Sequence, residues 1–273
     1  MNSVQRAAGW QLADVPFDAI ERAAVRERDD LFMLVCAASF IESGSDLYAG
    51  NLAELFEGDA PVRDWLRNDW EREELQHGRA LRAYIEHVWP DFRWEDAFAG
   101  FLDEYARLCT LDQLEPTRAQ ELVARCMVEM GTTTSYQALQ SVAPEPVLRE
   151  LTGRIRADEV RHYKHFHEYF LRYREQEHTH RSQVLATLVR RIAELRHSDI
   201  EIGLRHAARW RFDGGRTPEA IAARMHDMIA LMRANYPVDL AVRMAIQPLE
   251  LPPRWRPWIA RPLAALARNA WLH

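Results

Sequence analysis

The stretch "DWEREELQHGRALRAYI", residues 69–85, predicts a helix that carries charged and apolar side chains on one face. Glu74 and His77 are three positions apart, so their side chains project from the same side of a helix, about one turn from each other. Trp70 and Leu81 continue the same line along that face. A carboxylate and an imidazole on a face that also carries core residues need partners, because burying unpaired charge is costly.

The composition is that of an ordinary globular protein: 273 residues, 48% of them hydrophobic and 28% charged. The formal net charge of -6 gives no reason to expect a nucleic-acid partner. Cys36, Cys109 and Cys126 are widely spaced and odd in number, which argues against a disulfide framework, a zinc ribbon or a rubredoxin-type appendage. We find no signal peptide, expect no window to approach a membrane span, and therefore expect a cytoplasmic protein that is not transmembrane.

Helical periodicity, ended by proline and glycine, runs along almost the whole chain, and strand signals are nearly absent. The predicted helices of the first part are about residues 29–57, 61–88, 94–108, 116–142 and 145–175. Tight links join the first long helix to the second and the third to the fourth, whereas a long crossover separates the two pairs. This pattern predicts an all-α fold, a ferritin-like four-helix bundle with a long helix 2–3 crossover. We assign residues 1–180 to this bundle and residues 181–273 to a helical C-terminal extension packed on it.

Each long predicted helix carries a carboxylate near its middle. In chain order the candidates are Glu42, then Glu74 with His77, then Glu129, then Glu159 with His162. Two single glutamates and two Glu-x-x-His pairs are the ligand set of di-iron and di-manganese carboxylate bundles. Hard oxygen donors with one imidazole per metal suit iron or manganese better than a thiolate-rich zinc site. The sequence therefore predicts six metal ligands around two Fe ions, with a mixed Mn/Fe pair left open.

The spacing alone is weak evidence, because other Glu-x-x-His pairs occur: Glu175–His178, Glu177–His180 and Glu194–His197. We interpret these as solvated charge near a helix end or on an outer face. Height along the bundle separates the two sets. Glu42 and Glu74 lie about 15 and about 13 residues from their shared turn, roughly 22 and 20 Å at 1.5 Å per residue. The same count makes Glu129 and Glu159 level, so the six candidates are predicted to meet in one layer.

Two segments carry a family resemblance. "WEREELQHG", residues 70–78, resembles the W-x-x-E-E-x-x-H-G segment of soluble acyl-carrier-protein desaturases, and "ADEVRH", residues 157–162, resembles their A-D-E-x-R-H segment. The order of the ligands matches that family, as do Tyr48 after the first glutamate and Thr132 after the third. The resemblance implies that the six candidates ligate a di-iron centre and that Thr132 lies near the oxygen-binding side.

The resemblance also implies a function, an O₂-dependent di-iron oxidoreductase that abstracts hydrogen from an unactivated acyl chain. The expected substrate is linked to acyl carrier protein or is another hydrophobic small molecule, and a ferredoxin-type donor returns electrons. Thr132 is the candidate catalytic residue, as a proton relay to bound oxygen. A homodimer is expected from the resemblance only.

Other functions stay open. Aldehyde-deformylating di-iron oxygenases share a similar ligand order. Arylamine N-oxygenases use an additional histidine one turn before the fourth-helix pair, and Ile155 at that position counts against them. A ferritin-like or rubrerythrin-like ferroxidase is disfavoured by the long extension and the missing rubredoxin cysteines. A bundle that serves only as an interaction module is hard to reconcile with a complete set of six ligands.

Several residues near the ligands admit two interpretations. Gly78 and Gly131 either leave room for substrate or O₂ or permit close helix packing, and we favour packing. Trp70 is either an electron-transfer group or, more simply, a core residue. Asp46, one turn after the first ligand, is a candidate hydrogen-bond partner for a ligand histidine.

The segment after Glu250 is basic, with four arginines and no acidic residue. It could dock an acidic carrier protein or a small acidic ferredoxin. The alternative, which we favour, is a helical stripe packed on the body and formed by Ile259, Leu263, Leu266 and Ala270.

Overall fold

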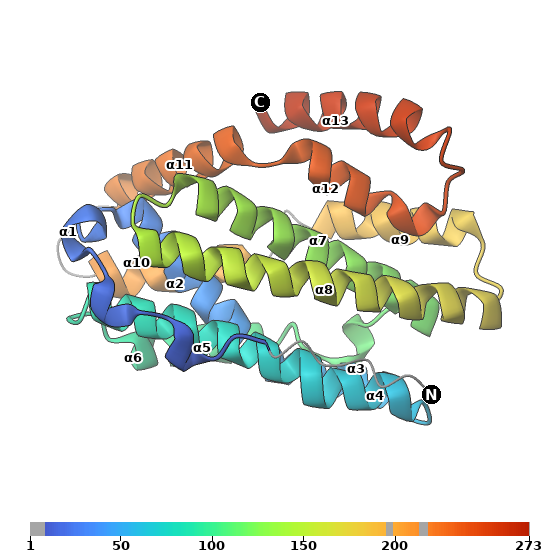
Figure 1. Cartoon of the computed structure of the whole chain (residues 1–273), viewed down its shortest axis with the longest axis horizontal. Coiled ribbons are helices and arrows are strands. Elements are labelled where there is room, and N and C mark those ends of the chain that lie inside the picture. Colours follow the sequence, from blue (N-terminus) through green and yellow to red (C-terminus); the bar gives the residue numbers. More distant parts are fainter. Residues whose placement is uncertain (1–8, 195–198, 213–217, 273) are drawn as a thin grey trace.

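The computed structural model describes residues 9–194, 199–212 and 218–272. Within these ranges every regular element is a helix. The expectation of an all-α fold is therefore confirmed for the described residues. Figure 1 shows the long helices running side by side.

The first half of the chain contains α1 (Arg22–Val25), α2 (Asp29–Ser43), α3 (Ser45–Leu55), α4 (Ala60–Trp65), the π-helical turn η3 (Leu66–Trp70), α5 (Glu71–Val88) and α6 (Trp94–Tyr105). The second half contains α7 (Arg118–Val142), α8 (Pro146–Gln176), α9 (Arg181–Glu194), α10 (Asp199–Phe212), α11 (Pro218–Asn235), α12 (Val238–Ala245) and α13 (Arg256–Leu272). Short 3₁₀ turns are η1 (Leu12–Asp14), η2 (Phe17–Ala19), η4 (Leu111–Gln113) and η6 (Gln247–Leu249).

A break at Gly44 divides the first predicted helix, so the expectation of one continuous helix over residues 29–57 is wrong. The Gly44 amide donates to the Phe40 carbonyl at 3.0 Å, which closes the last turn of α2. The Ser45 hydroxyl donates to the Glu42 carbonyl at 2.8 Å, which satisfies one of the carbonyls that a helix end leaves free. The break therefore lies two residues after a candidate ligand.

The second predicted helix, residues 61–88, is continuous but not α-helical throughout. α4 passes into the π turn η3 and then into α5. A π turn inserts one more residue than an α turn, and such turns are frequent at functional sites. The last residue of the turn, Trp70, is buried and donates its indole N–H to Glu129 at 3.1 Å. The distortion of this helix therefore lies directly beside the candidate ligands.

α7 and α8 form a hairpin with side-chain caps, within two residues of the predicted bounds. Thr117 accepts an amide of the first turn of α7 at 3.2 Å. Glu145 accepts two amides of the first turn of α8 at 3.0 and 2.8 Å, and also the Tyr84 hydroxyl of α5 at 3.0 Å. Glu177, just past α8, accepts the first two amides of α7 at 3.2 and 2.9 Å. These caps fix the two ends of the hairpin relative to each other.

Helices of the C-terminal part lie against the outer faces of the earlier ones. α9 contacts α7, α10 contacts α2 and α6, and α12 contacts α7 and α13. Figure 1 shows α11 to α13 along one edge of the molecule. Glu104 of α6 binds Arg205 of α10 at 2.9 Å and His206 at 3.1 Å.

The predicted apolar stripe of the C-terminal segment is wrong at two positions. Leu263 and Leu266 of α13 are 40% and 64% exposed, whereas Ala264 is buried, alone among the residues of this helix up to Asn269. Ile259 is partly buried, and the side chain of Ala270 lies outside the described residues. The buried position of α13 thus carries a short side chain, while its two leucines lie on the outside.

Two apolar clusters form the core, and the polar layer lies between them. From η3 into α5 the chain passes from Trp70 in one cluster to Leu81 in the other. In α8 the chain passes from Ile155, in the same cluster as Leu81, to Tyr163, in the same cluster as Trp70. The candidate ligands of these helices fall between those positions. Apolar packing on both sides therefore excludes water from the layer.

One helical segment in the described ranges, Asp29–Leu55, is long and apolar enough to cross a membrane by length and composition. The expectation that no window approaches such a span is wrong for this segment. It lies near the N-terminus, and 67% of its most apolar window is buried inside the structure. A core helix that is buried among other helices passes the same test of length and composition. This segment also carries a buried carboxylate, Glu42, which is 3% exposed.

The two glycines beside the ligands have different surroundings. A Cβ built on Gly78 would lie 2.4 Å from the Ser43 hydroxyl oxygen and 2.7 Å from the Ser43 amide nitrogen. The packing interpretation is therefore right for Gly78, which lets α5 approach the end of α2. A Cβ on Gly131 would have nothing within 4 Å among the described atoms, so the packing interpretation is wrong there.

We expect Gly78→Ala to destabilise the fold, because the added methyl group meets backbone atoms and overpacking typically costs about 1–3 kcal/mol. Gly131→Ala is the matched control, since its methyl group enters open space and alanine is favoured over glycine in a helix by about 1 kcal/mol. Urea unfolding followed by circular dichroism should lower the midpoint for Gly78→Ala only. Equal midpoints for the two variants would contradict the packing role of Gly78.

Candidate metal centre

The structure brings the six predicted ligands together in one buried layer. None is more than 8% exposed. They form two groups, each with ligand atoms within 4.8 Å of one another. The first group is Glu42, Glu74, His77 and Glu159, and the second is Glu74, Glu129, Glu159 and His162. Because Glu74 and Glu159 belong to both groups, the two clusters share an edge.

Each histidine turns its Nδ1 atom toward the carboxylates. His77 Nδ1 lies 3.1 Å from Glu159 Oε1 and 3.6 Å from Glu42 Oε2. His162 Nδ1 lies 3.0 Å from Glu74 Oε1 and 3.6 Å from Glu129 Oε2. The ring centroids are 6.0 Å apart. One imidazole therefore serves each group.

All six residues point an orphaned polar atom into this layer. The buried atoms without a hydrogen-bond partner in the described part of the chain include Glu42 Oε2, Glu74 Oε1, His77 Nδ1, Glu129 Oε2, Glu159 Oε1 and His162 Nδ1. Leaving one buried polar atom unpaired costs about 1–3 kcal/mol, so six together need a common partner. Four carboxylate oxygens and two imidazole nitrogens fit a pair of iron or manganese ions.

Three of the glutamates are held from outside through their other oxygen. The Tyr136 hydroxyl donates to Glu42 Oε1 at 2.5 Å, and the Trp70 indole donates to Glu129 Oε1 at 3.1 Å. The hydroxyl of Thr132 donates to the second oxygen of Glu159 at 2.8 Å. Each of these carboxylates therefore has one oxygen fixed and one directed inward. The sequence indicated Thr132 and Trp70 near the site, but it gave no sign of Tyr136.

The far nitrogen of each histidine is bound by a carboxylate that sequence reasoning missed. His77 Nε2 lies 3.0 Å from Asp158, and His162 Nε2 lies 2.8 Å from Glu73. Arg161 donates to both of these carboxylates, at 2.7 and 2.8 Å. Such outer carboxylates orient ligand histidines and raise their basicity. Their positions in the sequence could have indicated them. Asp158 directly precedes Glu159, Glu73 directly precedes Glu74, and each binds the ligand histidine of the other helix.

The N-terminal segment also reaches the centre. The Trp10 indole donates to Asp158 Oδ2 at 2.8 Å, and its ring stacks on His77 with 6.1 Å between centroids. Gln76 donates to the Trp10 carbonyl at 2.9 Å, which fixes the segment on α5. Trp10 lies outside the predicted helices, so helical periodicity could not have indicated its role.

Burial and mutual repulsion shift the ionisation of the metal-free cluster. Burial, with the neighbouring Glu159 charge, raises the pKa of Glu129 to about 8. Burial and the charges of Glu159 and Glu42 raise the pKa of Glu74 well above its usual range. Burial opposes the charge on Glu159, but the close approach of both histidines outweighs it and lowers the pKa of Glu159 well below its usual range.

The pKa values of both histidines are raised, although burial by itself would lower them. Burial disfavours the charged form of His77, yet its hydrogen bond to Asp158 and the nearby carboxylates of Glu159 and Glu42 raise its pKa well above the ordinary value. His162 behaves in the same way through its glutamate neighbours. Without a metal, protons therefore take the place of cations in holding this layer together.

Other residues singled out from the sequence do not contact the six. Asp46 accepts its neighbour's amide at 2.9 Å, so the predicted bond to a ligand histidine is wrong. Tyr48 donates to Glu121 at 2.6 Å. Of the remaining Glu-x-x-His pairs, Glu177 caps α7, His178 and His180 line a separate surface hollow, and His197 lies outside the described residues.

Comparisons with known proteins assign no family. No protein-family model and no curated protein matches the chain. The function therefore has to be inferred from the residues of the centre and their surroundings.

We expect the metal-free protein to lose stability as the pH rises from 6 to 8. The raised pKa of Glu129 contributes stability that is fully present below about 4.5 and is lost as the pH approaches 8. The raised pKa values of both histidines act in the same direction above pH 6.5. Bound divalent cations favour the ionised carboxylates, so metal should remove this dependence. Melting temperatures of chelator-treated and iron-loaded protein at several pH values test it. A metal-free protein that is equally stable at pH 6 and 8 would contradict the assignment.

Asp158→Asn should lower metal affinity about 10- to 100-fold, because a ligand histidine loses the charge that orients it. Glu150→Gln is the matched control, since Glu150 is an exposed carboxylate on the same helix that pairs with Arg154. Competition with a chromophoric chelator measures the affinity. The same affinity in both variants would mean that Asp158 has no orienting role.

Proposed function

We propose that this chain is an O₂-dependent di-iron oxidoreductase. The observation that carries the proposal is the set of six buried, unpartnered ligand atoms in two groups that share two glutamates. Buried carboxylates without a cation would carry a large desolvation cost, whereas two divalent ions would offset it.

The arrangement of helices supports a ferritin-like four-helix bundle. The ligands come from α2, α5, α7 and α8, one glutamate from each of two helices and a Glu-x-x-His pair from each of the others. α2 contacts α5, α7 contacts α8, and α5 contacts α8. The chain between α5 and α7, which includes α6, corresponds to the long crossover.

In this proposal each protein group has a defined task. Glu74 and Glu159, which belong to both groups, would be shared between the two metal sites, and each of the other four residues would serve one site. Bound iron supplies the electron transfer to O₂. The outer donors fix the carboxylates, and the apolar clusters above and below exclude water. The Thr132 hydroxyl, bonded to Glu159, is placed to hold or pass a proton at that oxygen.

The proposed substrate is an acyl chain or a similar apolar molecule, as in acyl-carrier-protein desaturases. The segments WEREELQHG and ADEVRH support this choice, since both their ligands and their outer carboxylates meet in the centre. Open space beside Gly131, with Thr132 partly exposed, offers an approach to the layer. The reaction balances when two substrate hydrogens, two donor electrons and two protons reduce one O₂ to two waters. A ferredoxin-type protein is the proposed donor.

Related functions are less well supported. The position of the extra histidine of arylamine N-oxygenases is Ile155, which is fully buried in an apolar cluster. A ferritin-like or rubrerythrin-like ferroxidase would use the same ligands but needs no organic substrate. The two classes differ in what consumes the oxygen, and this difference can be measured.

The test is the iron content of protein from iron-supplemented cells, measured by mass spectrometry beside Glu159→Ala and Glu168→Ala. Glu168 is the matched control, an exposed glutamate on the same helix. We expect about two irons per chain, largely lost only in Glu159→Ala, because that residue belongs to both groups. Absence of stoichiometric metal in a folded protein would refute the proposal. Oxygen consumption that depends on an acyl-carrier-protein substrate would then favour a desaturase, and ferrous oxidation with cage-sized assembly a ferroxidase.

A further inference from the structure

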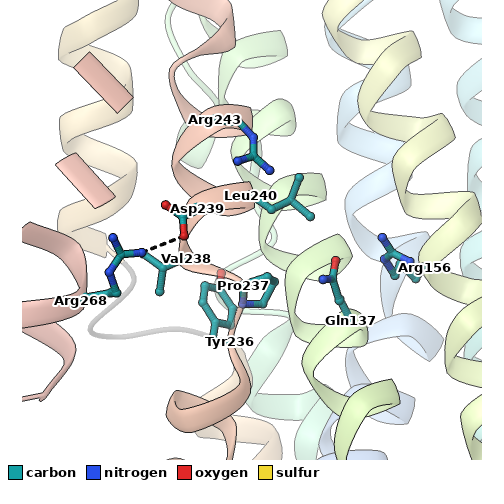
Figure 2. A pocket seen from close by; sticks show the side chains of 9 residues that line it. All are labelled: Gln137, Arg156, Tyr236, Pro237, Val238, Asp239, Leu240, Arg243 and Arg268. Carbon is teal, nitrogen blue, oxygen red and sulfur yellow. Dashed lines mark hydrogen bonds and ion pairs between the residues drawn. The ribbon is translucent and has the colours of Figure 1, made fainter. Parts of the chain in front are cut away.

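A cleft of about 600 Å³ lies between α12 and the α7–α8 hairpin. None of the six centre residues lines it. Figure 2 shows side chains from α7, α8, α12 and α13 around this space. The volume falls within the range of small-molecule sites, roughly 300–1,000 Å³.

The charge in this cleft is strongly unbalanced. Arg156 of α8, Arg243 of α12 and Arg268 of α13 line it, against one carboxylate, Asp239. Arg268 is paired with Asp239 at 2.8 Å, the dashed contact in Figure 2. Within the part of the chain that the structure describes, Arg156 and Arg243 make no ion pair. Two guanidinium groups therefore face the cleft without a counter-charge.

Two polar atoms in the lining are buried and unsatisfied. Arg156 Nε and Gln137 Oε1 have no hydrogen-bond partner among the described residues. They come from α8 and α7, and both residues line this cleft. Both side chains are partly exposed, so a shift of the Arg156 side chain and a half-turn of the Gln137 amide would turn their N–H groups toward a ligand oxygen in the cleft. An oxyanion bound there would thus give Arg156 and Gln137 a polar partner that they lack among the described residues.

The start of α12 forms the wall of the cleft opposite Arg156 and Gln137. The Thr134 hydroxyl of α7 donates to Tyr236 at 2.6 Å, which holds the start of α12 against α7. Pro237 and the first turn of α12, residues 238–240, line the cleft. The N-terminus of a helix carries partial positive charge, which adds to that of the arginines.

We propose that this cleft binds the oxyanion of a small ligand, a carboxylate or a phosphate, between Arg156 and Arg243. Guanidinium groups match both anions with paired hydrogen bonds. Pro237, Val238 and Leu240 give the rim an apolar part, which suits an acid with a hydrocarbon chain or a phosphate ester. The site uses none of the metal-centre residues, so this proposal does not depend on the di-iron proposal.

The experiment is isothermal titration of the full chain with inorganic phosphate and, separately, with octanoate, at constant ionic strength. We expect saturable binding of at least one probe, weakened about tenfold or more by Arg243→Gln and by Arg156→Gln, since a hydrogen bond to a charged group contributes about 1.5–3 kcal/mol. Arg261→Gln is the control, an exposed arginine of α13 that does not line the cleft, and it should bind as the unsubstituted protein does. Binding of phosphate alone identifies a phosphate ligand, and binding of octanoate alone identifies a carboxylate with an apolar chain.

Two results would overturn the proposal. One is no saturable binding of either probe at millimolar concentration. The other is binding that both substitutions leave unchanged, which would place the probe elsewhere, the metal centre included. Circular dichroism melting checks the fold of each variant. If Arg156→Gln fails to fold, Arg243→Gln decides alone, because Arg243 is exposed and its loss leaves the core intact.

Discussion

The rest of the structure depends on the burial of four carboxylates and two imidazoles in one layer between the helices. Such a layer is unstable by itself, because burial removes the water that ionised groups require. Outer donors relieve part of the cost by fixing one oxygen of Glu42, Glu129 and Glu159. The inward atoms remain unpaired, and only cations or protons can compensate them. The apolar clusters on both sides make this requirement stricter, since they keep water from acting as a substitute.

The same layer joins α5 to α8. On each of these helices a carboxylate directly before the ligand glutamate points sideways, because adjacent helical residues are about 100° apart. Glu73 thereby reaches His162, and Asp158 reaches His77. Each helix thus supplies a ligand pair and orients the histidine of the other helix. Arg161 donates to both carboxylates, so its single positive charge offsets part of the negative charge that they add.

Helical periodicity predicted the all-α fold and most of the main helices, and the Glu-x-x-His spacing together with the residue count from each turn predicted the convergence of the six candidate ligands. They could not predict features that depend on tertiary contacts. Trp10 reaches the centre only because its segment folds back on α5, and Tyr136 is one of many aromatic residues with helical spacing. The exposure of Leu266 has a similar cause, because which face of α13 is buried depends on the neighbour that it meets and not on its own pattern.

The count of residues from the shared turn predicted Glu42 and Glu74 to be level, although neither helix is regular. α2 ends at Ser43, and a π turn precedes Glu74, so a uniform rise of 1.5 Å per residue does not hold along either path. What sets their height is a contact beside the ligands themselves. Ser43 directly follows Glu42, and Gly78 lies four residues after Glu74. These two residues lie against each other, and no side chain fits between them. The level arrangement is therefore fixed by a close backbone approach at the centre, and the irregular turns can vary without moving the ligands apart.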